Sequence, residues 1–280
     1  GVVLKGDLPI GVDKRSVDTW MYPRQFRMGT STGAPPDAFD RNGQNWGFPT
    51  YNWEVMAEDG FAWWRTRLSL MANYFQAYRI DHVLGFFRIW ELDASCVGGI
   101  MGRFRPSVPV SKQELDERGL WDVERLVQPY IRTHVLEREL GEGWRAVAGA
   151  WMEEPWQGMW RFRGGVSTER SLLEAFAIGA GVDPSGAATV PQLGLPPAQS
   201  VLLDQLLDLQ RNVCLVRDHE DPSGASFYPR FDLMSTSSFK ELDPHWQGAL
   251  RWLHDDYFYG RQDATWRAHA MRTPPRLVGA

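Results

Sequence analysis

The chain has 280 residues, of which 43% are hydrophobic and 23% charged, a composition typical of globular proteins. Its formal net charge of −5 is mild and it carries no polybasic run, so neither nucleic acid nor an anionic membrane surface is an expected partner. No apolar run approaches the roughly 20 residues that a membrane-spanning helix needs.

Cysteine and aromatic content narrow the class further. The two cysteines, Cys96 and Cys214, are far apart and show no CxxC spacing, which fits a reducing compartment, so we expect a cytoplasmic protein without a disulfide framework. The chain also contains 14 Trp, 14 Phe and 8 Tyr. Such rings either build a large aromatic core or stack on sugar faces, and composition does not decide between these two roles.

The first part of the chain predicts a strand–helix–strand unit. Residues 2–4 are apolar and β-branched, which predicts a strand with Asp7 just beyond its end. Residues 19–53 lack a sustained period and predict a long ordered loop. Hydrophobic residues recur at three- and four-residue steps over residues 59–78, which predicts a helix, and residues 77–80 predict a second strand. This order indicates two parallel strands joined by a right-handed crossover.

The rest of the chain is predicted to be mainly helical. Residues 111–150 and 202–209 show helical periodicity, and residues 241–271 predict a long helix or a helix pair. Residues 213–216 are apolar and predict a short strand. Residues 164–198 are rich in Gly, Ala, Ser and Pro, which predicts a linker or a poorly ordered loop.

Several chemically active side chains lie together where the second predicted strand ends. Arg79 and Asp81 are two residues apart, so on a strand both side chains project from the same face. An adjacent guanidinium favours the charged carboxylate and orients it, as the nucleophile of a retaining glycosidase requires. His82 follows at the start of the next loop, where it could bind a sugar hydroxyl. A purely structural ion pair has the same spacing, so spacing alone leaves both interpretations open.

Four further residues are candidates for substrate binding. Asp7 could bind sugar hydroxyls at a strand end, or simply form a buried turn. Asp37, Gln44 and Trp46 offer hydrogen bonds and a stacking face within the predicted loop, although a loop held by its own aromatic residues would look the same. The His, Cys and acidic residues show no convincing metal-ligand spacing, and no Walker-type or GxGxxG loop is present, so we expect no metal or nucleotide cofactor.

Four motifs occur in an order and spacing that carry a family resemblance. They are Gly6-Asp7-Leu8-Pro9-Ile10 with Asp18-Thr19-Trp20, Ala34-Pro35-Pro36-Asp37, Gly43-Gln44-Asn45-Trp46-Gly47, and Arg79-Ile80-Asp81-His82. Together they resemble glycoside hydrolase family 77, the 4-α-glucanotransferases known as amylomaltases or disproportionating enzymes. Segments such as Arg88-Ile89-Trp90-Glu91-Leu92 and Phe227-Tyr228-Pro229-Arg230-Phe231 resemble the plant and algal cytosolic form that acts on maltose.

This resemblance implies an α/β fold, specifically a partial (β/α)8 TIM barrel with a largely helical insertion. Residues 1–109 would supply two strand ends and the substrate loop of the barrel. Residues 110–245 would form the insertion, and residues 246–280 a helical return toward the next barrel strand. The resemblance leaves the oligomeric state open.

The resemblance also implies roles for single residues. Asp81 would be the catalytic nucleophile and Arg79 its ion-pair partner. The substrate-binding residues would be Asp7, Asp37, Gln44, Trp46 and His82. The family transfers α-1,4-glucan or glucosyl units from maltose or malto-oligosaccharides to glucose, a heteroglycan or another glucan acceptor. No metal or organic cofactor takes part in this chemistry.

The family's acid/base glutamate lies in a Glu-Asp-Leu-Gly motif, which does not occur in these 280 residues. We therefore expect a chain truncated at both ends and inactive by itself, because a retaining mechanism needs two carboxylates. Two alternatives stay open at this stage. One is a non-catalytic glucan-binding protein of the same fold, and the other is an α-glucan hydrolase.

Overall fold

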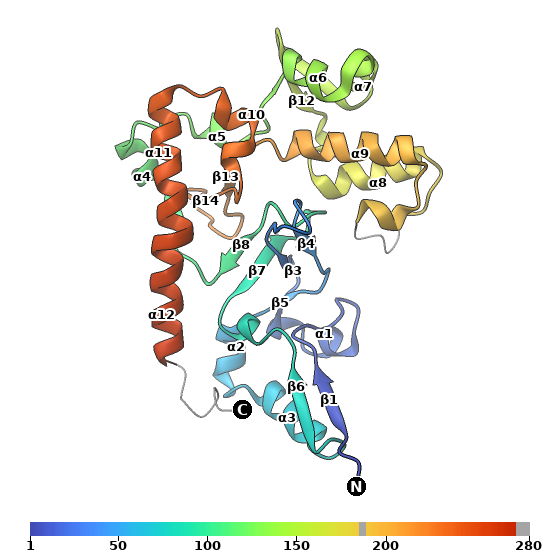
Figure 1. Cartoon of the computed structure of the whole chain (residues 1–280), viewed down its shortest axis with the longest axis vertical. Helices are drawn as coiled ribbons and strands as arrows, with labels where there is room; N and C mark the ends of the chain where they lie inside the picture. The colour runs from blue at the N-terminus through green and yellow to red at the C-terminus, as the bar shows by residue number, and fades with distance from the viewer. Residues whose placement is uncertain (185–188, 273–280) are drawn as a thin grey trace.

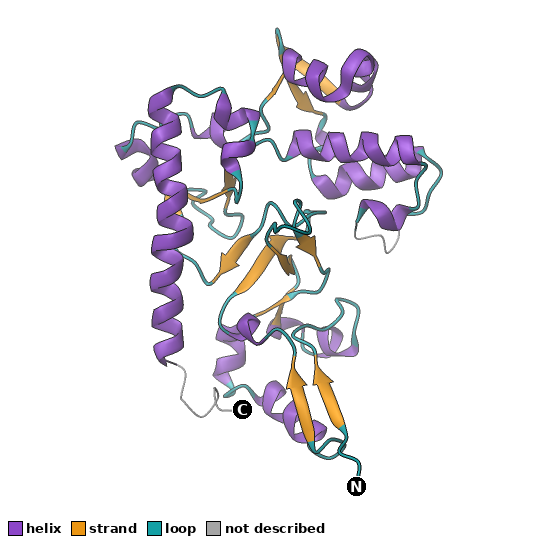
Figure 2. Ribbon diagram, in the orientation of Figure 1, coloured by secondary structure: helices purple, strands orange, loops and turns teal. Residues whose placement is uncertain are grey.

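The computed structural model describes residues 1–184 and 189–272, and combines helices with several small sheets (Figures 1 and 2). The N-terminal strands lie at one end of the molecule, and most of the helices gather at the other (Figure 2). The mixed helix-and-sheet class expected from the sequence is confirmed. The expectations for residues 185–188 and 273–280 lie outside the described residues.

The parallel strand pair predicted for the first 81 residues is present. Strands β1 (Lys5–Leu8) and β6 (Ala77–Ile80) pair in parallel, with helices α2 (Trp53–Glu58) and α3 (Ala62–Met71) between them in the chain. The second strand has the predicted bounds. The first was predicted too early, at residues 2–4. The helix predicted for residues 59–78 is present as the shorter α3, and α2, which precedes it, lies in the segment predicted to be a loop.

Pairing explains the error in the first strand. Val2 and Val3 are 90% and 67% exposed, because the residues that face β6 begin at Lys5. Asp7 therefore lies inside β1 and is opposite Arg79, rather than beyond the end of the strand. The two helices separate at Asp59, whose carboxylate accepts the Ala62 N–H and starts a new helix.

The long loop predicted for residues 19–53 is wrong in part, because this segment contains a short helix and short strands. Strand β3 is the central one of these, and it pairs antiparallel with β4 and with β7. Strand β8 extends the sheet beyond β7, and β2 pairs with β5 separately. The elements of this segment are α1 (Val17–Met21), β2 (Phe26–Arg27), β3 (Thr30–Ala34), β4 (Gln44–Asn45) and β5 (Thr50–Tyr51). The two later strands of the sheet are β7 (Ile89–Asp93) and β8 (Arg103–Arg105).

Aromatic residues fill the core beneath β1 and β6. Trp64 is 6% exposed and packs against Tyr51, Trp53 and Phe86 at ring-centroid distances of 5.3, 6.2 and 4.8 Å. Many of the rings noted in the composition therefore serve as core. Trp46 lies outside this core and borders the site described below.

The linker or poorly ordered loop predicted for residues 164–198 is wrong for Glu169–Gly179, which form a helix. Helix α8 lies within it and buries Leu172, Leu173 and Phe176 in the hydrophobic core shared with α9. These apolar residues recur on one face of the helix, and this spacing outweighs the Gly- and Ala-rich composition. The elements of this region are α6 (Thr133–Leu140), α7 (Trp144–Trp151), α8 (Glu169–Gly179) and α9 (Pro197–Gln210), with strands β10 (Ile131–Arg132), β11 (Met152–Trp156) and β12 (Met159–Phe162). The helix predicted for residues 202–209 is confirmed as part of α9.

A second helical region packs around Leu115, Phe227 and Leu250. Its long helix, predicted for residues 241–271, is confirmed as one continuous rod that passes through a π-helical stretch, η7 (Figure 1). The strand predicted for residues 213–216 overlaps the observed β13. The elements are β9 (Val110–Ser111), α4 (Lys112–Glu117), α5 (Val123–Val127), β13 (Leu215–Arg217), β14 (Ser226–Pro229), α10 (Ser237–Lys240), α11 (Pro244–Asp255), η7 (Asp256–Arg261) and α12 (Gln262–Arg272).

Candidate functional site

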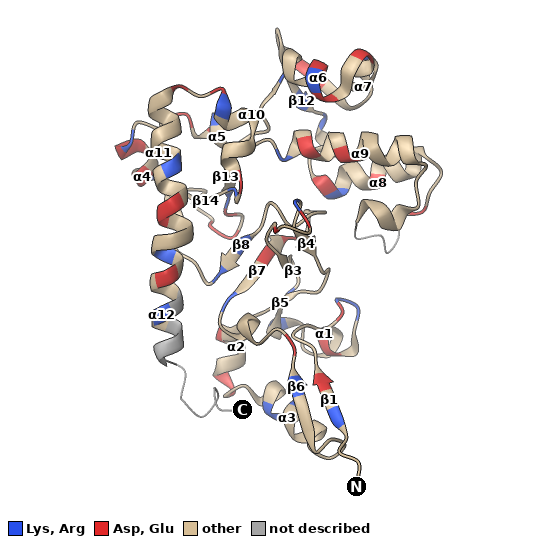
Figure 3. Ribbon diagram, in the orientation of Figure 1, with Lys and Arg blue, Asp and Glu red and all other residues tan. Residues whose placement is uncertain are grey.

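One guanidinium joins two carboxylates on neighbouring parallel strands. Arg79 Nη2 lies 2.5 Å from Asp81 Oδ1, and Arg79 Nη1 lies 3.3 Å from Asp7 Oδ2. The strand register produces this arrangement, because it places Asp7 directly opposite Arg79. Acidic and basic colours lie side by side on β1 and β6 in Figure 3. The expected Arg79–Asp81 ion pair is therefore present, and it includes a third member.

Asp81 is fixed in position and still accessible to solvent. Its backbone N–H donates to the Leu8 carbonyl at 3.0 Å, which continues the strand ladder by one residue. Its side chain is 46% exposed, and that of Arg79 is 57% exposed. A charged donor aligned on one carboxylate oxygen restricts the rotation of the carboxylate. The arrangement thus presents an oriented carboxylate at the end of a parallel strand.

His82 turns the chain immediately after Asp81. Its backbone is left-handed, at φ 51° and ψ 52°, which is an uncommon conformation for a residue other than glycine. Its carbonyl accepts the Gly85 N–H at 2.9 Å and so begins the short helical turn η2 (Val83–Phe86). The imidazole and the Trp46 ring pack edge to face, with ring centroids 5.3 Å apart. This contact brings the loop that carries Trp46 up to the strand that carries Asp81.

The loop residues divide into two groups. Trp46 donates its indole N–H to Gln44 Oε1 at 2.8 Å and stacks on Phe48 at 5.9 Å, so Gln44, Trp46 and His82 form one connected set. Asp37 instead accepts the backbone N–H groups of Phe39 and Asp40 and caps its own turn. The loop is thus partly held by its own side chains, which was the alternative interpretation left open by the sequence.

The Trp90-Glu91-Leu92 motif is buried beside the site rather than exposed in it. Glu91 is 0% exposed, accepts the Thr50 hydroxyl at 2.6 Å, and pairs with Arg105 at 3.0 Å and Arg103 at 3.2 Å. A buried carboxylate is tolerated only with such partners. Glu91, on β7, thus links this strand to β5 and to β8 and stabilises the sheet.

Comparison with known proteins shows that the chain belongs to the 4-alpha-glucanotransferase family, glycoside hydrolase family 77, whose family model matches residues 1–272. The family expected from the motifs is thus confirmed. The chain is 47% identical over 279 residues to the 4-alpha-glucanotransferase DPE2 of Oryza sativa subsp. japonica. The alignment covers 100% of this chain and 28% of the rice protein, so the chain spans little more than a quarter of that relative.

Other relatives match a shorter part of the chain. The 4-alpha-glucanotransferase of Chlamydia pneumoniae is 45% identical over 108 residues, which cover 39% of this chain and 20% of that protein. Among solved structures, an amylomaltase from Streptococcus agalactiae in complex with acarbose is 35% identical, with a TM-score of 0.37. That match covers 38% of this chain and 23% of the amylomaltase chain.

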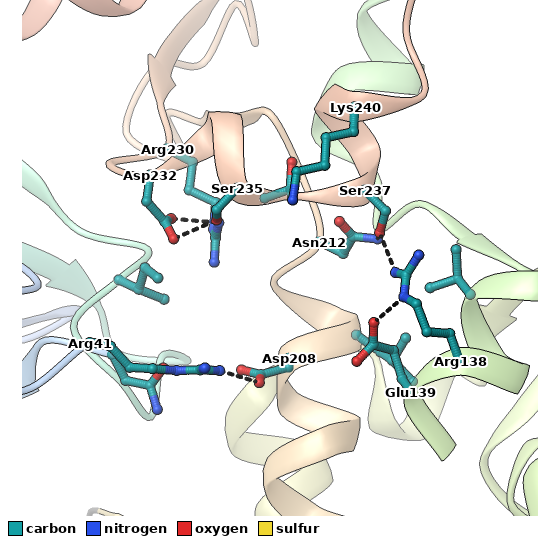
Figure 4. A pocket seen from close by; sticks show the side chains of 15 residues that line it. Arg41, Arg138, Glu139, Asp208, Asn212, Arg230, Asp232, Ser235, Ser237 and Lys240 are labelled. Atoms are coloured by element: carbon teal, nitrogen blue, oxygen red, sulfur yellow. Dashed lines mark hydrogen bonds and ion pairs between the residues drawn. The ribbon is translucent and has the colours of Figure 1, made fainter. Parts of the chain in front are cut away.

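A polar cavity of about 590 Å³ lies apart from this site, between the β3–β4 loop, α6, α9 and the segment that contains α10 (Figure 4). Its charged lining residues include Arg41, Asp208, Arg230 and Lys240. The sequence offered no sign that these residues share a cavity, because they come from segments far apart in the chain, although Arg230 lies in one of the segments that carry the family resemblance. Only a prediction of long-range contacts could have found this cavity.

Two further observations concern metals and membranes. Among the residues described, no group of three or more His, Cys, Asp or Glu side chains is placed to hold a metal ion. None of the described helices combines the length and the apolar composition needed to cross a bilayer.

Proposed function

We propose that the complete protein is a 4-α-glucanotransferase in which Asp81 is the catalytic nucleophile. The observation that carries this proposal is the half-exposed Asp81 carboxylate, held by Arg79 immediately after a parallel strand in a chain of this family. Ends of parallel strands carry the catalytic residues in (β/α) barrels. The retaining chemistry of glycosyl transfer requires a carboxylate of this kind.

The proposed reaction has two displacements. An Asp81 oxygen attacks the anomeric carbon of an α-1,4-linked glucan, and the bond to the leaving sugar breaks as a general acid protonates its 4-oxygen. The 4-hydroxyl of an acceptor sugar then attacks the same carbon, gives up its proton to the same group acting as base, and releases Asp81. The second carboxylate belongs to the complete protein, and we assign no residue of this chain to that role.

Five residues of this chain are proposed to bind the glucan. Asp7, which shares the Arg79 guanidinium with Asp81, would accept hydrogen bonds from sugar hydroxyls at the cleavage point. The connected side chains of His82, Trp46 and Gln44 would bind the adjoining glucosyl units. The proposed binding residues are thus Asp7, Asp37, Gln44, Trp46 and His82. Donors would be maltose and malto-oligosaccharides, and acceptors glucose, a heteroglycan or another glucan.

The barrel and its boundaries belong to the same proposal. We propose that β1 and β6 are neighbouring strands of a (β/α)8 barrel, supported by their parallel pairing through α2 and α3. The division into residues 1–109, 110–245 and 246–280 stays a prediction. A cytoplasmic location also stays a prediction, supported by the two buried free cysteines. Fractionation of cells that express the complete protein would test it.

The test of the proposal is Asp81→Asn in the complete protein. We expect transfer of maltose-derived glucosyl units to labelled glucose to fall by about three or more orders of magnitude, because an amide cannot form the covalent intermediate. Asp116→Asn is the matched control, since Asp116 is 47% exposed and also pairs with a cation, Lys112, at 2.8 Å.

The control variant should keep normal activity, and both variants should keep the wild-type unfolding midpoint. Product analysis separates transfer from hydrolysis, because hydrolysis leaves the labelled glucose unextended. If Asp81→Asn retains more than about a tenth of the activity, Asp81 is not the nucleophile.

A further inference from the structure

The cavity shown in Figure 4 contains a buried arginine whose charge is poorly compensated. The Arg230 side chain is only 8% exposed. Its Nη1 atom lies 2.5 Å from Asp232 Oδ1 but is not aligned for a hydrogen bond, and its Nε atom has no hydrogen-bond partner within the described chain. Burial lowers the pKa of the Arg230 guanidinium, and the opposing effect of Asp232 does not restore it. A buried cation in this state favours an additional anion.

The acidic residues of the cavity are already engaged. Asp208 pairs with Arg41 at 3.0 Å, and Glu139 pairs with Arg138 at 2.8 Å. Asp232, beside Arg230, also accepts the Ser235 hydroxyl at 2.7 Å. Asp208 and Glu139 thus neutralise arginines other than Arg230. Asp232 lies beside Arg230 without a hydrogen bond to it, so its carboxylate compensates that guanidinium only in part.

One positive charge remains in excess. The lining has four basic side chains, at positions 41, 138, 230 and 240, against three acidic ones, at positions 139, 208 and 232. Lys240 is exposed and forms no ion pair with any residue in 1–184 or 189–272. Figure 4 shows the Lys240 and Arg230 side chains extending toward the same open space on the side of Ser235. Two cationic groups from the segment that contains α10 thus face one region of the cavity.

The rest of the cavity suits hydroxyl groups. Ser235 and Ser237 line it together with the paired carboxylates, and all of these groups can exchange hydrogen bonds with a polyol. Its lining within the described part of the chain includes no aromatic ring, so these residues offer no stacking face of the kind that a neutral glucan would use. A volume of about 590 Å³ is far larger than a lone inorganic anion needs and falls in the usual range for small-molecule sites.

We propose that this cavity binds a phosphorylated sugar, with the phosphate between Arg230 and Lys240 and the sugar hydroxyls against the Ser235–Ser237 and Asp208 side. Phosphate supplies the hydrogen-bond acceptors that the Arg230 Nε and Nη1 atoms lack beside Asp232, in charge-assisted hydrogen bonds to two cations. The site is separate from the proposed nucleophile and does not depend on the proposed transfer reaction.

The experiment measures binding by titration calorimetry in the complete protein carrying Asp81→Asn, so that turnover does not interfere. The three probes are glucose 1-phosphate, inorganic phosphate and maltose. We expect glucose 1-phosphate to bind more tightly than inorganic phosphate, and maltose not to compete with it. Binding should also strengthen from pH 5.5 to pH 7.5, because the second phosphate ionisation has a pKa of about 6.

Variants at Lys240 test the location without disturbing the core, since Lys240 is exposed. Lys240→Gln should weaken glucose 1-phosphate binding by about tenfold, and Lys240→Glu by more, because an attraction becomes a repulsion. Lys112→Gln is the matched control, since Lys112 is 50% exposed and lies outside the cavity. It should leave the affinity unchanged.

Four results would overturn the proposal. They are no binding of glucose 1-phosphate, equal affinity for inorganic phosphate, displacement of glucose 1-phosphate by maltose, and unchanged affinity in both Lys240 variants. The second result would remove the sugar from the proposal, the third would show a neutral glucan site, and the fourth would place the ligand elsewhere. All of these readouts are independent of transfer activity.

Discussion

Two arginine–carboxylate pairs in this chain share their chemistry and differ in their surroundings. Arg211 Nη2 lies 2.6 Å from Glu169 Oε2, and the two side chains are 4% and 8% exposed. Arg79 Nη2 lies 2.5 Å from Asp81 Oδ1, and these side chains are 57% and 46% exposed. The first pair is buried and joins the first residue of α8 to the residue that follows α9. The second lies on strand β6 and the residue after it, in contact with solvent.

The difference in exposure indicates that the Arg211–Glu169 pair is the one that stabilises the fold. Glu169 also accepts the backbone N–H groups of Val97 and Gly98, at 2.9 and 3.2 Å, so it connects the segment after β7 to helix α8. Burial opposes the charged form of Arg211, yet Glu169 outweighs this effect and raises the pKa of Arg211. The exposed pair has no comparable role in the core, since exposed pairs add little to stability.

Of the substitutions that test this comparison, Glu169→Gln should have the largest effect on stability. It leaves the buried Arg211 with only the half-exposed Asp208, 3.6 Å away, as an acidic partner, so we expect the free energy of unfolding to fall by about 3–5 kcal/mol. Chemical denaturation followed by circular dichroism measures this loss. Glu174→Gln is the control, because Glu174 is exposed on the same helix. A loss below about 1 kcal/mol in Glu169→Gln would show that the buried pair does not hold this region together.

Leu172→Ala tests whether helix α8, which carries Glu169, belongs to the hydrophobic core. Leu172 is 0% exposed, so truncation should cost about 2–5 kcal/mol through lost burial and a residual cavity. Ile178, on the same helix, is 67% exposed, and Ile178→Ala should change stability by less than about 0.5 kcal/mol. Equal effects of the two substitutions, read from the same denaturation curves, would support the linker predicted from composition.

The Glu114–Arg261 pair is intermediate in exposure, at 30% and 15%, and should have an intermediate, pH-dependent effect on stability. Burial disfavours the charged Glu114 carboxylate, but hydrogen bonds from Arg261 and Ser111 prevail and lower its pKa to about 2. A depressed folded-state pKa contributes stability that is complete above the unfolded value of about 4.3 and is lost as the pH falls toward about 2.

Glu114→Gln tests this window. The difference in unfolding midpoint between wild type and variant should be constant above pH 5 and should shrink as the pH falls from about 4.5 to 2. Thermal unfolding in a series of buffers measures it. A difference that stays constant down to pH 2 would show that the Glu114–Arg261 pair does not contribute through its charge.

Arg79→Gln should have the smallest effect on stability, and it tests whether the exposed pair serves activity rather than stability. We expect the free energy of unfolding to change by less than about 1 kcal/mol, because the pair is exposed. Transfer activity should nevertheless fall, since Asp81 loses the donor that orients it, and Arg79→Lys should restore part of it. A large loss of stability with normal activity would reverse the roles assigned to the two pairs.

Local spacing predicted the part of the site that depends on neighbouring residues. Arg79 and Asp81 meet because residues two apart on a strand share a face, and β6 has the predicted bounds. The contribution of Asp7 to the same guanidinium was not foreseen, because it follows from the pairing register of β1 with β6. The Gly- and Ala-rich composition of residues 164–198 predicted a linker or loop, whereas burial of Leu172 and Leu173 stabilises the core helix α8.

The sequence by itself determined the family, the parallel strand pair and the Arg79–Asp81 ion pair, because each rests on motifs or on a repeat of a few residues. Only the tertiary structure decided that Arg41, Arg230 and Lys240 line one cavity. It also decided which of two similar ion pairs is buried. Both outcomes depend on contacts between distant segments, which no local pattern encodes, because burial is a property of the packed chain as a whole.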